Sequence, residues 1–317
     1  MSDELRWAAY AIPLRTRFRG IDVREGMVAN GPQGWSEWSP FWDYDAAESA
    51  AWLRAAHEAA HDVWPAPVRD RIPVNCTVAA VAAGPAREMV LRSGGCRTAK
   101  VKVAERGQSL AEDIARVEAV ADALGRGGRV RVDANGGWSV DAAVRAIREL
   151  DRAAGGLEYV EQPCAGVEEL ADVRRRVEVP VAADESIRRV DDPLRVRKLD
   201  AADVAVLKVQ PLGGVHACLR MAEQIGLPVV VSSALETSVG LAAGVALAAA
   251  LPELPYACGL NTLALLEADV TRDPVRVVDG TMAVRRPEAD GALLARHTSP
   301  DLQARWDERL AAVEALR

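Results

Sequence analysis

The segment RVRVDANGGWSVDAAVRAIRELDRAAGGLEYVEQP, residues 129–163, contains one complete repeat of the fold that the sequence predicts. It starts and finishes with short apolar runs of strand-like character, and each run ends on a carboxylate, Asp133 in the first and Glu161 in the second. Between them, the apolar residues of 140–150 recur at the three-to-four-residue spacing of a helix. A strand, a helix and a second strand in this order predict a βαβ unit with two parallel strands.

Charged side chains end comparable runs in the neighbouring repeats. Lys102 ends the run TAKVK, Asp184 follows the run PVAA, and Lys208 ends the run VAVLK. Together with Asp133 and Glu161, these residues are separated by 31, 28, 23 and 24 positions. Each interval is about the length of one strand and one helix with their loops. The spacing therefore counts successive βα units.

Further strand-like runs bring the number of repeats to eight. They lie at 71–80, 228–236 and 254–262. Helical apolar spacing separates the strands, as at 110–124 and 213–226. Eight alternating strands and helices within about 200 residues predict the α/β class and a (β/α)8 TIM-like barrel over residues 71–270. Because the C-terminal strand ends carry the chemistry in such barrels, we expect the five charged residues to form one site.

The chain of 317 residues is longer than a barrel of roughly 250 residues requires. Six of the eight tryptophans and both phenylalanines precede residue 65, which marks a change in composition before the barrel. After the barrel, 273–284 favours a hairpin and 300–316 a terminal helix. We therefore predict an α+β capping domain that is formed from residues 1–70 and completed by 271–317.

Composition and charge exclude several classes of protein. A net charge of −7 provides no basic surface for nucleic acid. The longest apolar stretch, 239–254, is interrupted by Gly and Pro and is shorter than the ~20 residues of a membrane span. The first residues, MSDELRWAAY, are acidic where a signal peptide is basic, so a cytoplasmic location is expected. Five cysteines without a C-x-x-C pair predict reduced thiols.

Three of the five charged residues are carboxylates on neighbouring strand ends. Asp133, Glu161 and Asp184 would project into one cavity, where three anions are tolerable only around a cation. No histidine ends any of the strand-like runs. Because oxygen ligands of this kind suit a hard divalent ion, the sequence predicts a Mg²⁺ site, with Mn²⁺ as a substitute.

The other two charged residues are lysines on opposite sides of the predicted barrel. Lys102 ends the second strand and Lys208 the sixth, four strands apart in a ring of eight. A small-molecule carboxylate bound between them would have one amine on each face. An uncharged lysine can remove a carbon-bound proton while Mg²⁺ stabilises the resulting charge. The predicted reaction therefore begins with proton abstraction next to a carboxylate, which gives an enediolate.

A structural interpretation of these charges is the alternative. A single charged residue after a strand is most often a helix cap or a solvated loop residue. However, the alternation in TAKVKV and VAVLKV points both lysines into the top of the barrel, where an unpaired ammonium is costly. Five such residues in register favour the active-site interpretation.

The motifs around these residues resemble those of the enolase superfamily, in its muconate lactonizing subgroup. The matching residues are Lys100-Val-Lys102, Asp133-Ala-Asn135, Glu161-Gln-Pro163, Asp184-Glu185-Ser186 and Lys208. A lysine base that acts with Mg²⁺ is an established pattern of that superfamily. The resemblance implies that Lys102 is the acid/base, and that Lys208 faces it as a stabilising cation or a second base.

The resemblance implies roles for the neighbouring residues as well. It gives the three carboxylates as the Mg²⁺ ligands. Lys100 would contact the substrate carboxylate, while Asn135 and Glu185 would support the metal site from behind its ligands. The resemblance leaves a monomer and a homodimer open.

Within the subgroup, three segments resemble the o-succinylbenzoate synthase family. They are 17–44, 232–240 and 259–262. The implied reaction is the syn dehydration of 2-succinyl-6-hydroxy-2,4-cyclohexadiene-1-carboxylate to 2-succinylbenzoate, a step of menaquinone biosynthesis. N-succinylamino acid racemases and dipeptide epimerases share the pattern and need both lysines as bases, so racemisation or epimerisation is the alternative function.

Residues outside the motifs are candidates for further substrate contacts. Arg19 and Arg24 belong to the predicted cap and would approach the substrate from above, although charged loop residues are more often solvated. Ser232 and Ser233 end the seventh strand and would present hydroxyl or backbone donors to a second carboxylate.

One motif favours a different class of enzyme. His57-Glu58-Ala-Ala-His61 has the spacing H-E-x-x-H, which on a helix places two imidazoles and a glutamate on one face, as in zinc hydrolases. No third-ligand motif follows it, and zinc hydrolysis leaves the five strand-end charges unexplained. We therefore interpret it as a helix face and keep zinc hydrolysis as a remote alternative.

Overall fold

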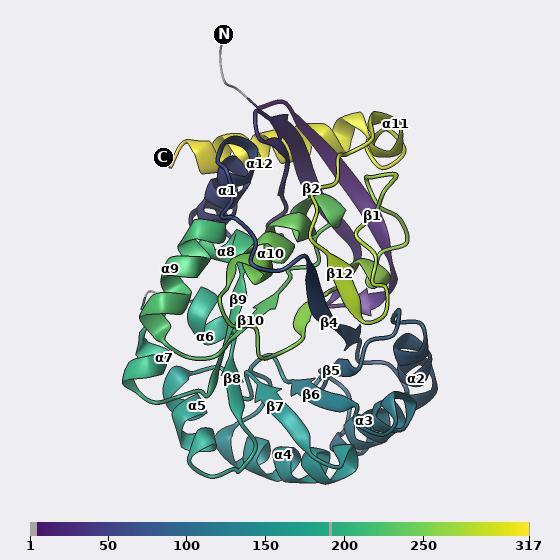
Figure 1. Ribbon diagram of the computed structural model, residues 1–317, viewed down its shortest axis with the longest axis vertical. Coiled ribbons are helices and arrows are strands. Elements are labelled where there is room, and N and C mark those ends of the chain that lie inside the picture. The colour runs from purple at the N-terminus through teal and green to yellow at the C-terminus, as the bar shows by residue number, and fades with distance from the viewer. Residues whose placement is uncertain (1–4, 190–191, 317) are drawn as a thin grey trace.

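Eight parallel strands form a closed barrel at the centre of the computed structural model, which describes residues 5–189 and 192–316 (Figure 1). The strands follow one another around the ring in chain order, and the last pairs with the first. They are β4 (Arg71–Val78), β5 (Thr98–Lys102), β6 (Arg129–Asp133), β7 (Leu157–Glu161), β8 (Val181–Ala183), β9 (Val204–Lys208), β10 (Val229–Ser232) and β11 (Cys258–Asn261). The predicted (β/α)8 barrel is confirmed.

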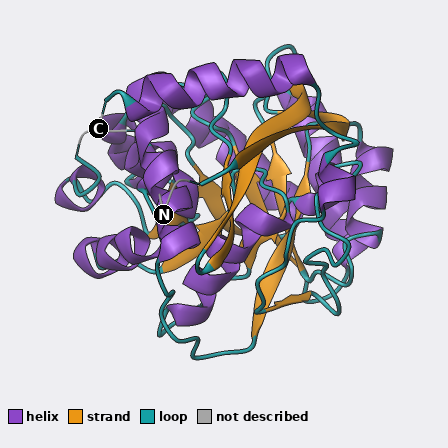
Figure 2. Ribbon diagram, turned by 90° about the horizontal axis from the view of Figure 1, so that it is seen from above, coloured by secondary structure: helices purple, strands orange, loops and turns teal. Residues whose placement is uncertain are grey.

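Helices cover the outside of the barrel, as Figure 2 shows from above. The longer ones are α2 (Ala83–Leu91), α3 (Leu110–Leu124), α4 (Val140–Ala154), α5 (Val167–Arg174), α9 (Val215–Ile225) and α10 (Ser238–Ala250). One-turn helices follow several strands: α6 (Glu185–Arg188), α7 (Arg195–Lys198), α8 (Val209–Leu212) and the 3₁₀ turn η1 (Leu263–Leu265).

The helix α4 illustrates why these segments form helices at these positions. Its buried residues are Ala143, Val144, Ala146, Ile147 and Leu150, and all of them except Val144 belong to the barrel core. Its end is set by Gly155, whose φ of 69° lies in the left-handed region that a side chain would disfavour. The apolar pattern therefore fixes the buried face, and the glycine fixes the length.

A three-stranded antiparallel sheet and the helices that flank it lie over one side of the barrel (Figure 1). The strands are β1 (Trp7–Phe18), β2 (Ile21–Gly31) and β3 (Gly34–Trp38), followed by α1 (Ala46–His61). From the other end of the chain come the short α11 (Gly291–Leu294) and the long α12 (Pro300–Glu314). The ring of Trp38 packs edge-on against Trp306 at 5.4 Å, so the two ends of the chain share one core.

The segment between the barrel and α11 differs from the predicted hairpin. Residues 273–284 contain one short strand, β12 (Thr281–Ala283), and within this segment a single antiparallel bridge joins Val278 to Thr281. β12 pairs antiparallel with the start of β4 instead. The hairpin prediction is wrong because the first residues of β4 offer this segment a longer pairing partner than its own turn does.

None of the described helices is long and apolar enough to cross a membrane.

Two carboxylates are buried where the N-terminal sheet meets the barrel. Glu37 of β3 and Glu236, in the loop after β10, are both shielded from solvent and both close to the backbone of Gly240. Burial, together with the charge of Glu37, raises the pKa of Glu236 to about 7. The folded protein therefore holds this proton more tightly than the unfolded chain does.

We expect Glu236→Gln to change the pH dependence of stability. A carboxyl whose pKa rises from 4.5 to about 7 on folding stabilises the fold fully at low pH, and this contribution is lost as the pH rises through 7. Glutamine does not titrate, so the variant keeps its stability where wild type loses this contribution. Its free energy of unfolding relative to wild type should therefore increase between pH 5 and pH 8, by about 3 kcal/mol at most.

Urea denaturation at the two pH values measures this difference, and Glu253→Gln, at an exposed glutamate, is the control. An equal effect of Glu236→Gln at pH 5 and pH 8 would contradict the assignment.

Candidate active site

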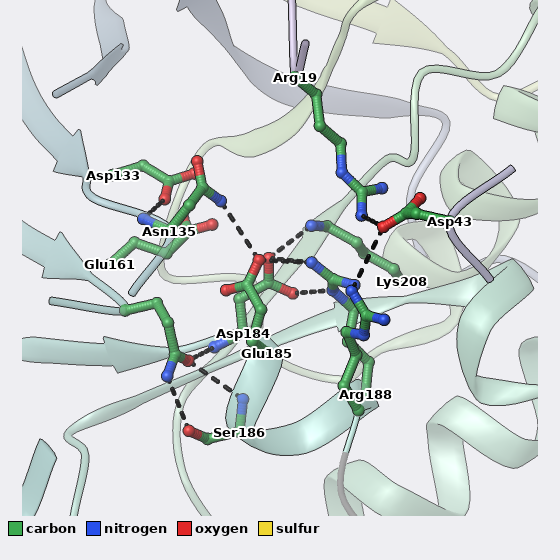
Figure 3. A network of polar contacts seen from close by, with 12 residues as sticks. Arg19, Asp43, Asp133, Asn135, Glu161, Asp184, Glu185, Ser186, Arg188 and Lys208 are labelled. Carbon is green, nitrogen blue, oxygen red and sulfur yellow. Dashed lines mark hydrogen bonds and ion pairs between the residues drawn. The ribbon is translucent and has the colours of Figure 1, made fainter. Parts of the chain in front are cut away.

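The carboxyl ends of five consecutive strands bring charged side chains to one level. The strand register places Lys102 of β5 beside Asp133 of β6, and Asp133 beside Glu161 of β7. Asp184 directly follows β8, and Lys208 ends β9. The three carboxylate residues are fully buried. Parallel strands of a barrel end at a common rim, so these side chains surround one space; Figure 3 shows Asp133, Glu161, Asp184 and Lys208 around it.

Lysine ammonium groups neutralise two of the carboxylates. Lys100 Nζ lies 2.7 and 2.9 Å from the two carboxylate oxygens of Glu161 and 3.2 Å from Asp133 Oδ2. Lys102 Nζ donates to Asp133 Oδ2 at 2.6 Å and to Asn135 Oδ1 at 2.7 Å. The Lys102 side chain is 17% exposed and that of Lys100 only 7%. Lys102 is therefore the more accessible amine of the pair.

The third carboxylate has two cationic partners on the other side of the space. Lys208 Nζ lies 2.5 Å from Asp184 Oδ2, and Arg188 Nε lies 2.9 Å from Asp184 Oδ1. Arg188, in α6, also donates to Glu185 and to the hydroxyl of Tyr44 from the N-terminal segment.

Arg188 therefore links Asp184 and Glu185 of the barrel to Tyr44 of the N-terminal segment. Sequence reasoning missed this arginine. The signal that was available is its position four residues after Asp184, the spacing of one helical turn.

The pKa values of the buried groups follow from these contacts. Burial alone would raise the pKa of Asp133, but Lys102 and Lys100 hold it well below its usual range. Arg188 and Lys208 do the same for Asp184, again against the effect of burial. Burial and the charge of Asp133 raise the pKa of Glu161 to about 7. Burial and the neighbouring carboxylates therefore favour the protonated form of Glu161 more than Lys100 opposes it.

Four cationic and four anionic side chains balance each other in this space. They are Lys100, Lys102, Lys208 and Arg188, against Asp133, Glu161, Asp184 and Glu185. As they stand, no three His, Cys, Asp or Glu side chains of residues 5–189 and 192–316 are close enough together to hold a metal ion. The predicted Mg²⁺ site therefore stays a prediction.

The donor set nevertheless fits a hard divalent cation. Every candidate ligand is a carboxylate, and a single ammonium, that of Lys100, already lies within 3.2 Å of both Asp133 and Glu161. One oxygen of Glu185, Oε2, is buried without a hydrogen-bond partner beside this cluster. A divalent cation would give the balanced site a net charge of +2, which suits a substrate with two carboxylates.

Loop backbone after the strands supports the charged residues. Gln162, with a positive φ of 41°, accepts hydrogen bonds from the backbone of Asp184 at 3.0 Å and Ser186 at 3.1 Å. Asn135, with a φ of 46°, donates to Glu185 at 3.2 Å. Asn135 and Glu185 thus lie beside the carboxylates, where the sequence predicted supporting residues. The role of Gln162 was missed, although it lies inside a quoted motif.

A cavity opens above the charged residues, between the barrel and the N-terminal sheet. Its barrel side includes Lys100, Lys102, Asn135, Arg188, Lys208, Ser232 and Ser233. Its cap side is formed by Phe18, Arg19, Phe41, Tyr44 and Trp52. The guanidinium of Arg19 lies 4.0 Å from the centre of the Phe41 ring and is held by Asp43 at 3.1 Å. Sequence reasoning considered Arg19 and Phe41 but missed Phe18, Tyr44 and Trp52 of this wall.

The structure gives Arg24 a different place from the one predicted. Its side chain is 1% exposed and does not line the cavity. The guanidinium donates instead to backbone oxygens, including those of Ala234 at 3.2 Å and Leu235 at 3.0 Å. The prediction of a direct substrate contact is therefore corrected, because the donors of Arg24 are already used within the protein.

The H-E-x-x-H segment of α1 has a structural role. Glu58 accepts hydrogen bonds from the backbone of Val215 at 2.6 Å and His216 at 3.2 Å, and so caps the start of α9. The ring of His61 contacts the backbone oxygen of His57 at 3.0 Å. Since Glu58 is engaged in this cap, the arrangement argues against the zinc-hydrolase alternative.

Known families match both parts of the chain. The enolase C-terminal domain-like family matches residues 82–292, and the enolase N-terminal domain-like family matches residues 9–60. Among solved structures, muconate lactonizing enzyme from Pseudomonas putida superposes with a TM-score of 0.78 at 21% identity, over 94% of this chain and 99% of that one. The L-Ala-D/L-Glu epimerase from Bacillus subtilis superposes with a TM-score of 0.76 at 23% identity, over 90% and 97%. These structures show the fold.

Curated relatives are much closer in sequence. The o-succinylbenzoate synthase of Thermobifida fusca is 66% identical over 97% of this chain and 95% of the relative. The o-succinylbenzoate synthase of Mycolicibacterium smegmatis is 55% identical over 96% and 94%. With both domains matched and relatives of this similarity over nearly the whole length, the chain belongs to the enolase superfamily.

Proposed function

We propose that the chain is an o-succinylbenzoate synthase, which dehydrates 2-succinyl-6-hydroxy-2,4-cyclohexadiene-1-carboxylate to 2-succinylbenzoate in menaquinone biosynthesis. The observation that carries this proposal is the identity of 54–66% to relatives of that name, over nearly the full chain. The buried cluster of lysines and carboxylates supplies the chemistry that such a reaction needs.

Lys102 is the residue best placed to move the protons. In its uncharged form, its amine removes the proton next to the ring carboxylate and leaves an enediolate. The resulting ammonium then gives that proton to the hydroxyl on the same face, which leaves as water. The electron pair of the enediolate forms the new ring double bond and restores the carboxylate. One amine serves both halves, and it ends the reaction uncharged.

Other residues hold the substrate and its developing charge. Asp133, Glu161 and Asp184 would hold Mg²⁺, which supplies positive charge to the enediolate oxygens when it is bound. Lys208, four strands from Lys102 around the barrel, offers a second cation to the opposite face. Arg19 offers a guanidinium to the succinyl carboxylate from the cap side of the cavity.

Racemisation of N-succinylamino acids is the second candidate, because the structure keeps both lysines on the cavity. We expect Lys208→Arg to separate the two. Arginine keeps the positive charge but is no usable base at neutral pH, so dehydration should persist within about a hundredfold of wild type while racemisation disappears.

Ring absorbance and optical rotation, followed separately for the folded variant, measure the two activities. Two results together would favour the racemase. Wild type would show negligible dehydration, and each lysine variant would lose deuterium exchange at the α-carbon for one enantiomer only.

A further inference from the structure

The loop after β10 forms a wall of the cavity and has a strained backbone. Ser233, Ala234 and Leu235 all line the cavity. Leu235 has a φ of 67°, in the left-handed region that residues with a side chain rarely adopt. Such a conformation persists only when surrounding contacts hold it in place.

Arg24 supplies those contacts from the N-terminal sheet. Its Nε donates to the backbone oxygen of Leu235 at 3.0 Å, and its Nη2 donates to that of Ala234 at 3.2 Å. The same Nη2 donates to Ser39 Oγ at 2.9 Å. Ser39 in turn exchanges two hydrogen bonds with Gln210, two residues after Lys208. One buried guanidinium therefore joins the sheet to two strand ends of the barrel.

Glu37 fixes the other end of the same loop. Its carboxylate accepts hydrogen bonds from the backbone of Thr237 at 3.1 Å and of Gly240 at 3.1 Å. It also accepts from the hydroxyls of Tyr10 at 2.8 Å and Ser39 at 2.7 Å. Neither Glu37 nor Arg24 lines the cavity. Both act on it through the loop.

We infer that Arg24 and Glu37 are positioning residues, which hold the segment 233–237 in the shape that binds the part of the substrate farthest from its reacting carboxylate. β10 lies across the ring from β6, which carries Asp133, so this wall is on the opposite side of the cavity from Asp133. The part of this role that concerns substrate binding rests on the proposed function.

The first test is the kinetics of Arg24→Met, with Arg69→Met as the matched control. Arg69 also donates to backbone oxygens, those of Ala248 and Leu251 among them, but does not line the cavity. We expect KM of Arg24→Met to rise about tenfold with kcat within about threefold, a smaller rise for Arg24→Lys, and no change for Arg69→Met. An unchanged KM in Arg24→Met, or an equal rise in Arg69→Met, would overturn the role.

The second test is amide hydrogen exchange, which does not depend on activity. Exchange in 233–240 should accelerate in Arg24→Met but not in Arg69→Met, because the loop loses its restraints. If Arg24→Met does not fold, Glu37→Gln should accelerate exchange at Thr237 and Gly240. Unchanged exchange in a folded variant would overturn the role. If wild type lacks dehydration, the proposed function fails, while faster exchange still supports positioning.

Discussion

Lys102→Ala is expected to abolish dehydration, with a loss in kcat of about 10⁴-fold. The syn reaction needs one amine to take the α-proton and to return it to the departing hydroxyl, and Lys102 is the more accessible lysine beside Asp133. The variant should also lose exchange of the α-proton with solvent. The change in ring absorbance measures dehydration, and incorporation of deuterium from solvent measures exchange of the α-proton.

The chain offers a matched control for this experiment. It has four lysines, and Lys198 is the one outside the cavity, paired with Asp192 at the surface. Lys198→Ala should keep wild-type turnover. Turnover of Lys102→Ala within tenfold of wild type would remove Lys102 from the role of acid/base.

Chelation of divalent metal is expected to have an effect of similar size. EDTA should reduce activity to background, and Mg²⁺ or Mn²⁺ should restore it, because the balanced cluster gains its net positive charge only with the cation. Calorimetric titration of the chelated protein with Mg²⁺ should show binding, which Asp184→Asn weakens. Full activity after exhaustive chelation would contradict the predicted metal site.

The barrel and its charged residues could be predicted because both depend on local sequence. Alternating strand and helix patterns count the repeats, and a charge at each strand end, such as Asp133 or Lys208, needs no knowledge of distant segments. Closure of the barrel then brings these ends together. The same logic placed Ser232 and Ser233 on the cavity.

The contacts between the sheet and the barrel could not be predicted in this way. Arg24 and Arg19 are both arginines of the N-terminal segment, yet one is buried against backbone oxygens and the other lines the cavity. Which of them faces the substrate depends on how β2 packs on the loop after β10, more than 200 residues away. Arg188 has a local signal in its spacing to Asp184, but its contact with Tyr44, 144 residues away, could not be predicted.

The most direct test of the proposed function is an assay of the purified protein with both substrate classes. With Mg²⁺ present, we expect kcat/KM for dehydration of the cyclohexadiene carboxylate to exceed that for racemisation of N-succinylamino acids by about a hundredfold or more. Ring absorbance reports the first reaction and optical rotation the second. Efficient racemisation with negligible dehydration would contradict the assignment as o-succinylbenzoate synthase.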